Sequence, residues 1–320
     1  MHLLKKTVLI ISMVMILMTF LVSCGKETNP EKVLSKTVET LQQKVQNPSI
    51  SSIGGEWTVI ALARSGEKCK DGYLQQYRKN VATILKKNNG KLPSGKCTEL
   101  ARVILALTAI GENADRFEGN PLTSDLIEYN NIINEGMSGA IFALLAADAG
   151  NYDISSKEHM DMEHDLCRYL LSQRFSDGGF SMDNLNSDPD VTAMALIALA
   201  KHRQDETVQN AVDNAITYLS TSFQVDGSFT SYGVKSSESI AQIIIALCEL
   251  GVDPCGKKFT YQGKTLIDCL LEYYDDGAFL HTKNGGENLL ATEEGCLALV
   301  AYKRFVGKQP SLYTMKQKTT

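Results

Sequence analysis

The sequence is poor in several features, and each scarcity excludes a class of protein. It has one tryptophan and seven prolines in 320 residues, and it has no Ser/Gly-rich spacer. This composition argues against several small domains joined by flexible linkers. The chain also lacks internal basic runs and carries a net charge of −5 at pH 7. Because nucleic-acid-binding domains carry basic patches, we expect no nucleic-acid partner.

Metal and disulfide signatures are also scarce. The eight cysteines include no C-x-x-C pair, and no spacing of cysteine and histidine predicts a zinc site, so we expect neither metal nor cofactor. His159 and His164 stand five residues apart on a predicted helix and do not share a face, which favours surface positions. Cys69 and Cys97 flank a predicted helix, and an exported chain permits a disulfide between them without requiring one. Small buried positions in apolar helices are expected for Cys167, Cys248, Cys269 and Cys296.

The one long hydrophobic run lies at the N-terminus. Lys5 and Lys6 precede apolar residues 8–22, which is the pattern of a secretory signal. The following Ser23-Cys24-Gly25 resembles the lipobox of bacterial lipoproteins, with Cys24 as the lipidated residue. This resemblance implies a signal peptide over 1–23, a tether over 24–30, and anchoring on the outer side of the bacterial cell membrane through two or more acyl chains. An uncleaved membrane anchor is the alternative, although the run is short for a span.

A repeated phrase organises the rest of the chain. Asp-Gly-x-Phe occurs at 177–180, 226–229 and 276–279, and an Ala-Leu-centred apolar segment follows each copy. Repetition at this scale is typical of stacked supersecondary units. The sequence therefore predicts an array of helical hairpins, and an array closed into a ring would enclose a central cavity.

Six hairpins can be aligned on an Ala-aliphatic step. The aligned alanines are Ala61, Ala106, Ala143, Ala198, Ala246 and Ala298, separated by 37 to 55 residues. Their helices are apolar nearly all round, as expected for an inner ring. More amphipathic helices are predicted between them at 31–46, 71–88, 121–133, 159–174, 206–222 and 263–274. Glycines predicted to end inner helices are Gly66, Gly111, Gly150 and Gly251. We therefore predict an all-α fold, an α/α toroid over 31–307, followed by a frayed basic tail over 308–320.

These motifs resemble a known superfamily. The turn Asp177-Gly-Gly-Phe180 followed by SDPDVTAMAL (187–196) resembles the terpenoid cyclase and protein prenyltransferase α/α toroids. The segments 238–247 and 291–302 look closest to bacterial surface proteins with prenyltransferase/squalene-oxidase repeats. That branch is similar to the toroid domain of the cobalamin-binding proteins intrinsic factor and transcobalamin. The resemblance implies the toroid fold and a ligand held at its centre.

The catalytic motifs of that superfamily are incomplete here. Class II cyclases protonate their substrate with an Asp-x-Asp-Asp motif, and the matching stretch places Asp188 at the first acid and Asp190 at the proton donor. Val191 replaces the last acid, so Asp190 is at most a candidate catalytic acid. Helix capping by both aspartates is the alternative. The zinc motif of prenyltransferases is missing, and His281 is interpreted as a loop residue.

Candidate ligand-binding residues gather at the start of the inner helices. Glu135, Asp190 and Glu238 each stand eight residues before an aligned alanine. Shared periodicity predicts one rim of the ring, where helix-dipole compensation is the alternative role. The full candidate set is Trp57, Glu135, Asp188, Asp190, Tyr232, Glu238, Gln242 and Glu293, with Glu56 and Thr98 nearby. The repeat residues Phe180, Phe229 and Phe279 are expected to pack beneath their own turns.

Three classes of function remain open from the sequence. The first choice is a lipid-anchored, extracytoplasmic binding module for a small, partly apolar and possibly corrinoid-like ligand, or for a surface partner protein. The first alternative is a cyclase- or prenyltransferase-like enzyme with a degenerate acid motif, and the second is a structural surface protein. A corrinoid site would be open or completed by a partner, because the chain has no room for the β-rich domain that completes the site in the cobalamin carriers.

Overall fold

The computed structural model describes residues 29–183 and 185–315. The predicted signal peptide, Cys24 and nearly all of the predicted tether lie outside this range. Among the described residues, none of the helices combines the length and apolar character needed to cross a membrane.

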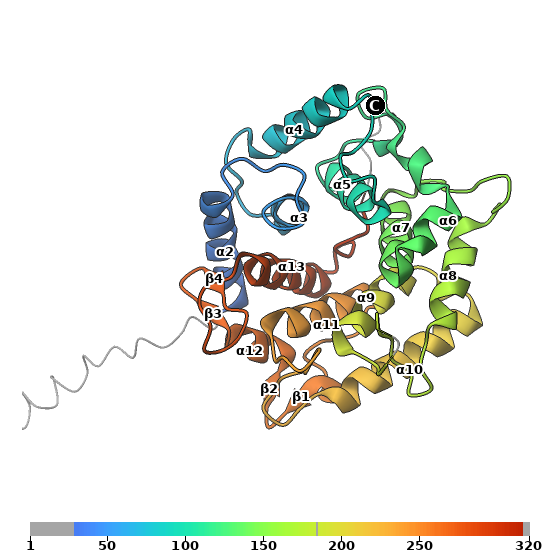
Figure 1. The fold of residues 1–320 in the computed structure, drawn as a ribbon. Coiled ribbons are helices and arrows are strands. Elements are labelled where there is room, and N and C mark those ends of the chain that lie inside the picture. Colours follow the sequence, from blue (N-terminus) through green and yellow to red (C-terminus); the bar gives the residue numbers. More distant parts are fainter. Residues whose placement is uncertain (1–28, 184, 316–320) are drawn as a thin grey trace, which may run out of the picture.

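Two concentric rings of helices form the molecule (Figure 1). The inner ring consists of α3 (Glu56–Ser65), α5 (Cys97–Ala109), α7 (Gly136–Gly150), α9 (Pro189–Leu199), α11 (Ser237–Glu249) and α13 (Leu289–Val306). The outer ring consists of α2 (Pro30–Lys44), α4 (Tyr73–Lys87), α6 (Tyr129–Asn134), α8 (Met162–Ser172), α10 (Glu206–Ser222) and α12 (Leu266–Leu271). Each inner helix packs against the next, and α13 packs against both α2 and α3, which closes the ring. The fold is the predicted all-α toroid.

Small side chains let the inner helices approach one another. All six aligned alanines are fully buried, and their inner helices contact helices of both rings, so almost every face is covered. The outer helices bury one stripe each, as α10 does with Val208, Val212 and Leu219. At roughly 1.5–3 kcal/mol for each large apolar side chain buried, this shared core is the main source of stability.

The predicted helix ends are largely confirmed. Asp188 caps α9 by accepting hydrogen bonds from the backbone N–H groups of Asp190 and Val191, and Pro189 occupies the first helical position. Gly66, Gly111 and Gly251 all adopt left-handed backbone conformations. The prediction for Gly150 is wrong by one residue. Gly150 is the last residue of α7, and Asn151 takes the left-handed position instead, with φ of 51°.

The geometry of the three repeat turns accounts for their Asp-Gly-x-Phe residues. In the first copy the Asp177 carboxylate accepts a hydrogen bond from the Gly179 N–H, and Gly178 adopts φ of 95°. A Cβ at Gly178 would lie 2.8 Å from the Asn214 carbonyl oxygen, so only glycine fits. Phe180, Phe229 and Phe279 are fully buried, which confirms that they pack beneath their turns. Thr192 of α9 and Thr292 of α13 accept hydrogen bonds from the backbone N–H groups of Phe180 and Phe279.

Two details depart from the predicted helices. The outer helix predicted at 121–133 divides into a 3-10 segment, η2 (Leu122–Leu126), and the short α6, because its Ser, Asp and Asn residues are weak helix formers. Shorter 3-10 turns are η1 (Ala114–Arg116) and η3 (Lys257–Phe259). Two β-ribbons also form, β1 (Thr260–Tyr261) with β2 (Lys264–Thr265) and β3 (Tyr274–Asp275) with β4 (Ala278–Phe279). Both turn on two residues with positive φ, the geometry that Asp-Gly favours.

The described part of the C-terminal tail is not frayed, which corrects our expectation. Leu312, Tyr313 and Met315 are buried. The Arg64 guanidinium at the end of α3 donates hydrogen bonds to the carbonyl groups of residues 311, 312 and 314. The carboxylate of Glu249, at the end of α11, accepts from the Tyr313 N–H, and the Met315 N–H donates to the last turn of α7. The tail therefore crosses the ring at the C-terminal ends of the inner helices.

The seven cysteines of the described residues are all free thiols. Cys69 and Cys97 form no disulfide with each other. The four cysteines expected in apolar helices, Cys167, Cys248, Cys269 and Cys296, are all buried.

Candidate functional site

The centre of the toroid is narrow. Its cavity has a volume of about 40 Å³, comparable to the space of one water molecule. Nine side chains from five inner helices and the tail residue Tyr313 form its wall. The lining residues are Trp57, Ile141, Phe142, Leu145, Met194, Ile197, Gln242, Glu294, Leu297 and Tyr313. Tyr313 belongs to the segment that covers the C-terminal ends of the inner helices, so the cavity opens toward their N-terminal ends, which we call the mouth.

Glu294 is the acidic side chain of the cavity wall. Burial within the ring is the main cause that raises the pKa of Glu294 to about 8, with repulsion from Glu238 and Asp190 adding to it. A hydrogen bond with Gln242 opposes this rise. Its Oε2 atom is buried and has no hydrogen-bond partner. At pH 7 this carboxyl group therefore carries a proton in most molecules.

Asp190 lies nearer the mouth, in the first turn of α9. Burial raises the pKa of Asp190 to about 6, and the neighbouring carboxylates of Asp188 and Glu238 raise it further. Hydrogen bonds with Ser239 and Ser231 lower it. Its Oδ1 atom is buried without a hydrogen-bond partner. Such orphaned buried atoms are rare in proteins and call for a proton, a water or a ligand.

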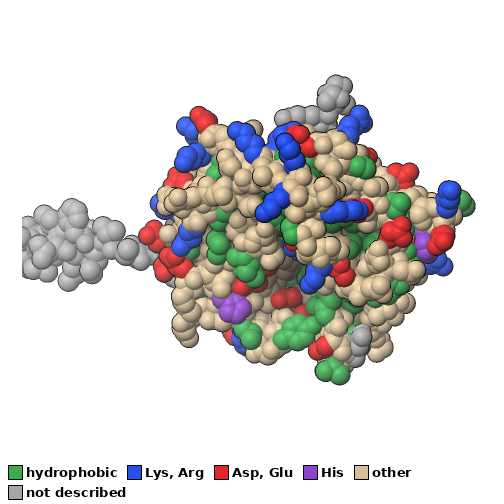
Figure 2. Space-filling view, turned by 45° about the horizontal axis from the view of Figure 1, so that its top comes forward, with side chains coloured by type: hydrophobic (Ala, Val, Ile, Leu, Met, Phe, Trp, Pro, Cys, Tyr) green, Lys and Arg blue, Asp and Glu red, His purple; other side chains and the backbone are tan. Residues whose placement is uncertain are grey.

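The other predicted mouth residues surround these two acids. The capping role of Asp188 is confirmed by its bonds at the start of α9. Its other oxygen, Oδ2, accepts a hydrogen bond from the Tyr232 N–H. Tyr232 has φ of 44°, and 60% of its surface is exposed. Glu238 Oε1 lies 2.8 Å from Nδ1 of His281. His281 is thus a loop residue, as interpreted from the sequence, and its partner is Glu238. Figure 2 shows acidic side chains within a hollow in this face of the molecule.

Glu135 and Glu293 take the alternative role, helix-dipole compensation, at the N-terminal ends of neighbouring inner helices. Glu135 accepts hydrogen bonds from the backbone N–H groups of Cys97 and Thr98, at the start of α5. Glu293 is fully buried and accepts from the N–H groups of Gly54 and Thr58 near α3. Each carboxylate therefore caps a neighbouring inner helix, because the helix N-terminus offers unpaired N–H donors.

Glu56 is a second internal acid that ties helices together. Its carboxylate accepts hydrogen bonds from the Ser51 N–H and the Tyr77 hydroxyl, and it pairs with Arg102 of α5 at 3.4 Å. Burial raises the pKa of Glu56 to about 7 despite Arg102. The Glu56–Arg102 pair and the Tyr77 hydroxyl together join α3, α4 and α5. Arg102 is therefore engaged by Glu56 rather than by Asp188, Asp190 or Glu238.

Sequence reasoning missed Glu294 although the alignment contained the signal. The residues four positions before the aligned alanines include Trp57, Met194, Gln242 and Glu294, all of which line the cavity. The acids that share a position eight residues before an alanine lie one helical turn closer to the N-terminal end. The positions four residues before the aligned alanines lie one helical turn further along the inner helices and mark the cavity wall.

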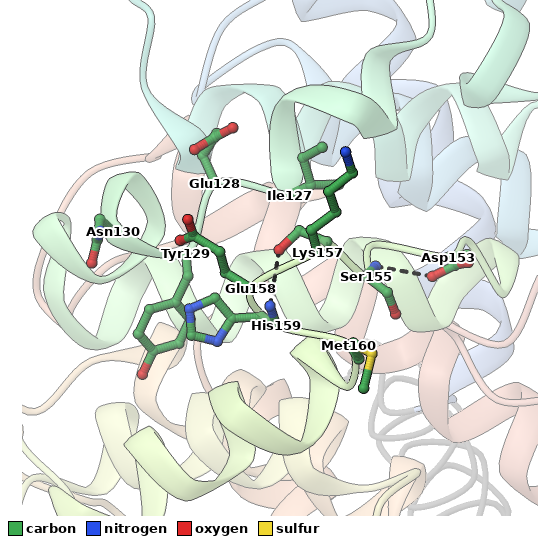
Figure 3. A pocket seen from close by; sticks show the side chains of 11 residues that line it. Ile127, Glu128, Tyr129, Asn130, Asp153, Ser155, Lys157, Glu158, His159 and Met160 are labelled. Carbon is green, nitrogen blue, oxygen red and sulfur yellow. Dashed lines mark hydrogen bonds between the residues drawn. The ribbon is translucent and has the colours of Figure 1, made fainter.

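A large surface cleft lies elsewhere, on the outer side of the third and fourth hairpins (Figure 3). Its volume is about 900 Å³, and segments 127–130 and 153–160 line it. Tyr129 and His159 stack there with ring centroids 4.3 Å apart, and His159 pairs with Asp165. His159 thus has the surface role predicted for it. None of the unpartnered buried atoms found among the described residues belongs to this cleft, so we place the candidate site at the mouth.

Comparison with known proteins supports the fold. No known family model matches the sequence, and no curated protein is significantly similar to it. Among solved structures, unsaturated glucuronyl hydrolase from Bacillus sp. GL1 is 10% identical, with a TM-score of 0.57 over 90% of this chain and 98% of that one. The GH76A α-1,6-mannanase from Salegentibacter sp. HEL1_6 is 12% identical, with a TM-score of 0.54 over 85% of this chain and 99% of that one.

A third solved structure has a lower score. The ent-copalyl diphosphate synthase from Streptomyces platensis is 20% identical, with a TM-score of 0.41 over 76% of this chain and 49% of that one. For the first two structures, whose TM-scores exceed 0.5, the likeness shows a shared fold, and their low identities leave function to the site itself. The shared fold is the α/α toroid.

Proposed function

We propose that this protein binds a small ligand at the mouth of the toroid, and that the ligand offers several hydrogen-bond donors and one apolar face. The observation that carries the proposal is the pair of buried, unpartnered carboxyl oxygens, Asp190 Oδ1 and Glu294 Oε2. Leaving a buried polar atom unsatisfied costs about 1–3 kcal/mol. A ligand hydroxyl or amine that reaches these oxygens would recover that energy.

The charges of the mouth define the polar part of the ligand. Asp188, Asp190 and Glu238 lie close together near the opening, and His281 is the hydrogen-bond partner of Glu238. Such an arrangement repels anions and favours hydroxyl groups or amines. Linear isoprenoid diphosphates and other anionic substrates are therefore poor candidates.

Exposed apolar side chains define the other part. Met182, Tyr232 and Val234 expose 37%, 60% and 41% of their surfaces on the two loops that precede α9 and α11. Met182 also contacts Ser138 at the start of α7 through its sulfur atom. An aromatic ring beside carboxylates suits a sugar, whose C–H face stacks on the ring while its hydroxyls donate to the acids. The two structural neighbours with the higher scores are carbohydrate-degrading enzymes by name, which makes sugars a reasonable first panel.

Cavity size argues against ligands that would fill the ring. A volume of about 40 Å³ is far below the 300–1,000 Å³ of typical small-molecule sites. A corrinoid inside the ring, suggested by the resemblance to the cobalamin carriers, would require the inner helices to separate. We therefore place the ligand at the mouth, with only a single group directed at Glu294.

The test is a binding titration of the purified protein with neutral and amino sugars and, separately, with corrinoids. Asp190→Asn should weaken sugar binding about tenfold while keeping the fold, because it replaces a charged acceptor by a neutral one. Tyr232→Ala should weaken it by a similar factor. Tyr261→Ala is the matched control, since Tyr261 is also exposed but lies in the β1–β2 ribbon. Equal binding by all three variants would refute a site at the mouth.

A second candidate function is acid–base catalysis at the same place. Two nearby carboxyl groups have different pKa values, about 8 for Glu294 and about 6 for Asp190. At pH 7 one is mostly protonated and the other mostly ionised, the arrangement that supports a general acid and a general base. The cyclase motif itself remains incomplete, because the buried Val191 stands at the position of its last acid.

A turnover assay distinguishes ligand binding from acid–base catalysis. For an enzyme, Glu294→Gln and Asp190→Asn should each lower kcat by about 10²–10⁴-fold with little change in substrate binding. The assay follows product release from oligosaccharides and, separately, from linear isoprenoids. A binding module should give no product with any of these compounds, and Asp190-dependent product would overturn the binding proposal.

We propose further that Cys24 carries a lipid anchor and that the toroid lies on the outer side of the cell membrane. The support is the sequence of the signal-like segment and its lipobox-like end. Cys24→Ala should prevent acylation and release the protein from the detergent phase, or block its maturation. Full partitioning of Cys24→Ala into detergent with an uncleaved N-terminus would favour a membrane-spanning anchor instead.

A further inference from the structure

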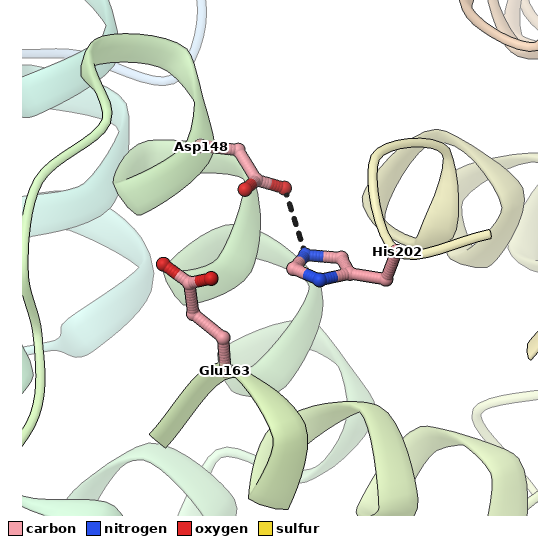
Figure 4. A group of neighbouring side chains, drawn as sticks. All are labelled: Asp148, Glu163 and His202. Atoms are coloured by element: carbon pink, nitrogen blue, oxygen red, sulfur yellow. Dashed lines mark hydrogen bonds and ion pairs between the residues drawn. The ribbon is translucent and has the colours of Figure 1, made fainter. Parts of the chain in front are cut away.

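Three side chains converge on the outer side of the ring, away from the mouth. Asp148 lies in the last turn of α7, Glu163 in the first turn of α8, and His202 three residues after α9. Figure 4 shows that the two carboxylates and the imidazole point toward one another. Their candidate ligand atoms all lie within 4.8 Å of one another. Two consecutive helices and the turn after a third thus supply one group each to the same small space.

The group is held in place rather than loosely exposed. His202 Nε2 lies 3.0 Å from Asp148 Oδ2, and the exposed fractions of these two side chains are 16% and 11%. The Cys167 thiol, one helical turn after Glu163, also hydrogen-bonds with His202. A cleft of about 340 Å³ leads to the group from the surface, so an ion would have an entry path. The remaining lining residues of this cleft are Asp161, His164, Lys201, Gln204, Asp205 and Val208.

An ion pair alone does not account for all three groups. His202 is the hydrogen-bond partner of Asp148, but Glu163 has no hydrogen bond or ion pair to any described residue. Glu163 is half-buried, and its carboxylate lies beside the Asp148–His202 pair. The nearby Lys201 ammonium is directed at the backbone carbonyl of Asp148. A second carboxylate beside a satisfied pair is the arrangement that a divalent cation would stabilise.

We propose that Asp148, Glu163 and His202 form a binding site for a divalent transition-metal ion such as Zn²⁺. One imidazole nitrogen with two carboxylate oxygens suits zinc, whereas Mg²⁺ and Ca²⁺ prefer oxygen ligands alone. Three protein ligands leave a position for water, and Cys167 helps to orient the ring. The sequence gives no sign of this site, because its ligands come from two helices and a turn that are separate in the sequence and follow no local spacing.

The experiment is a Zn²⁺ titration of the purified protein after treatment with a chelator. We expect one Zn²⁺ to bind per chain, with Glu163→Gln and His202→Gln each weakening this binding at least about 100-fold, since even indirect supports of metal ligands are worth 10–100-fold. His164→Ala is the matched control, because His164 lines the same cleft outside the three-residue group. It should bind Zn²⁺ as the unchanged protein does.

Calorimetry gives a second measurement and should likewise detect one bound ion per chain. Binding that is absent, or equally strong in folded Glu163→Gln and His202→Gln, would overturn the proposal.

Discussion

Glu294→Gln is expected to stabilise the protein at neutral pH and to have little effect near pH 4.5. The unfolded chain loses the Glu294 proton above about pH 4.5, whereas the folded ring holds it until about pH 8. Between these values the folded state binds more protons than the unfolded state. The free energy of unfolding therefore falls as the pH rises through this window. Glutamine has nearly the same shape and has no proton to lose, so it removes this dependence.

The size of the effect follows from the width of the window. One pH unit corresponds to at most about 1.4 kcal/mol, and pH 7 lies roughly 2.5 units above the unfolded pKa, which gives an upper value of about 3 kcal/mol. Water entering the cavity would reduce it, so we expect a gain of about 1–3 kcal/mol at pH 7. The hydrogen bond with Gln242 can be kept by the new amide.

Urea unfolding of both proteins at about pH 5, 6 and 7 would measure this difference. The gap between the two free energies of unfolding should widen steadily with pH. Glu158→Gln, at an exposed position of the outer cleft, is the control and should give no gap. If the free energies of unfolding of Glu294→Gln and of the unchanged protein differ by the same amount at all three pH values, Glu294 is not buried as a neutral acid.

Three further predictions concern the fold. Residues 25–320 should give a strongly helical circular dichroism spectrum and one cooperative unfolding transition, because each hairpin of a closed ring lacks a core of its own; two well-separated transitions would contradict this. Truncation after Gln309 should lower the free energy of unfolding by about 2 kcal/mol, since the buried Leu312, Tyr313 and Met315 are lost while the tail regains its entropy; unchanged thermal stability would argue against the tail packing. Gly178→Ala should lower the free energy of unfolding by about 2–3 kcal/mol through backbone strain and a clash with Asn214. At Gly233 φ is 82° and no atom would lie within 4 Å of the added Cβ, so Gly233→Ala should lower it by only about 1 kcal/mol in the same denaturation assay.

The ring could be predicted from the sequence because its signals are local. Apolar periodicity, Asp-Gly turns and caps such as Asp188-Pro189 all act within a few residues, and the six aligned alanines all occupy the buried inner ring. The division of the third outer helix was harder to foresee, since it depends on a small balance of weak helix propensities. Burial of the tail was not predictable by these means, because its partners Arg64 and Glu249 lie far away in the sequence.

The candidate site was only partly predictable for the same reason. Trp57 and Gln242, two of the candidate binding residues, line the cavity. Helix periodicity could not tell whether a carboxylate at a helix start faces the opening, as Asp190 does, or turns sideways to cap a neighbour, as Glu135 does. That choice depends on the offset between adjacent helices, which no single helix encodes. The group of Asp148, Glu163 and His202 depends on two helices and the turn after a third at once.

The crossing tail has a consequence for the shape of any ligand. Because residues 311–315 span the ring beneath the cavity, held at α3, α7 and α11, the toroid is a blind pit rather than a tunnel. A long polymer cannot be threaded through it, and whatever reaches Glu294 must leave by the way it entered. A polymeric ligand would thus be recognised at a chain end or a side branch, never in the middle of an unbranched strand.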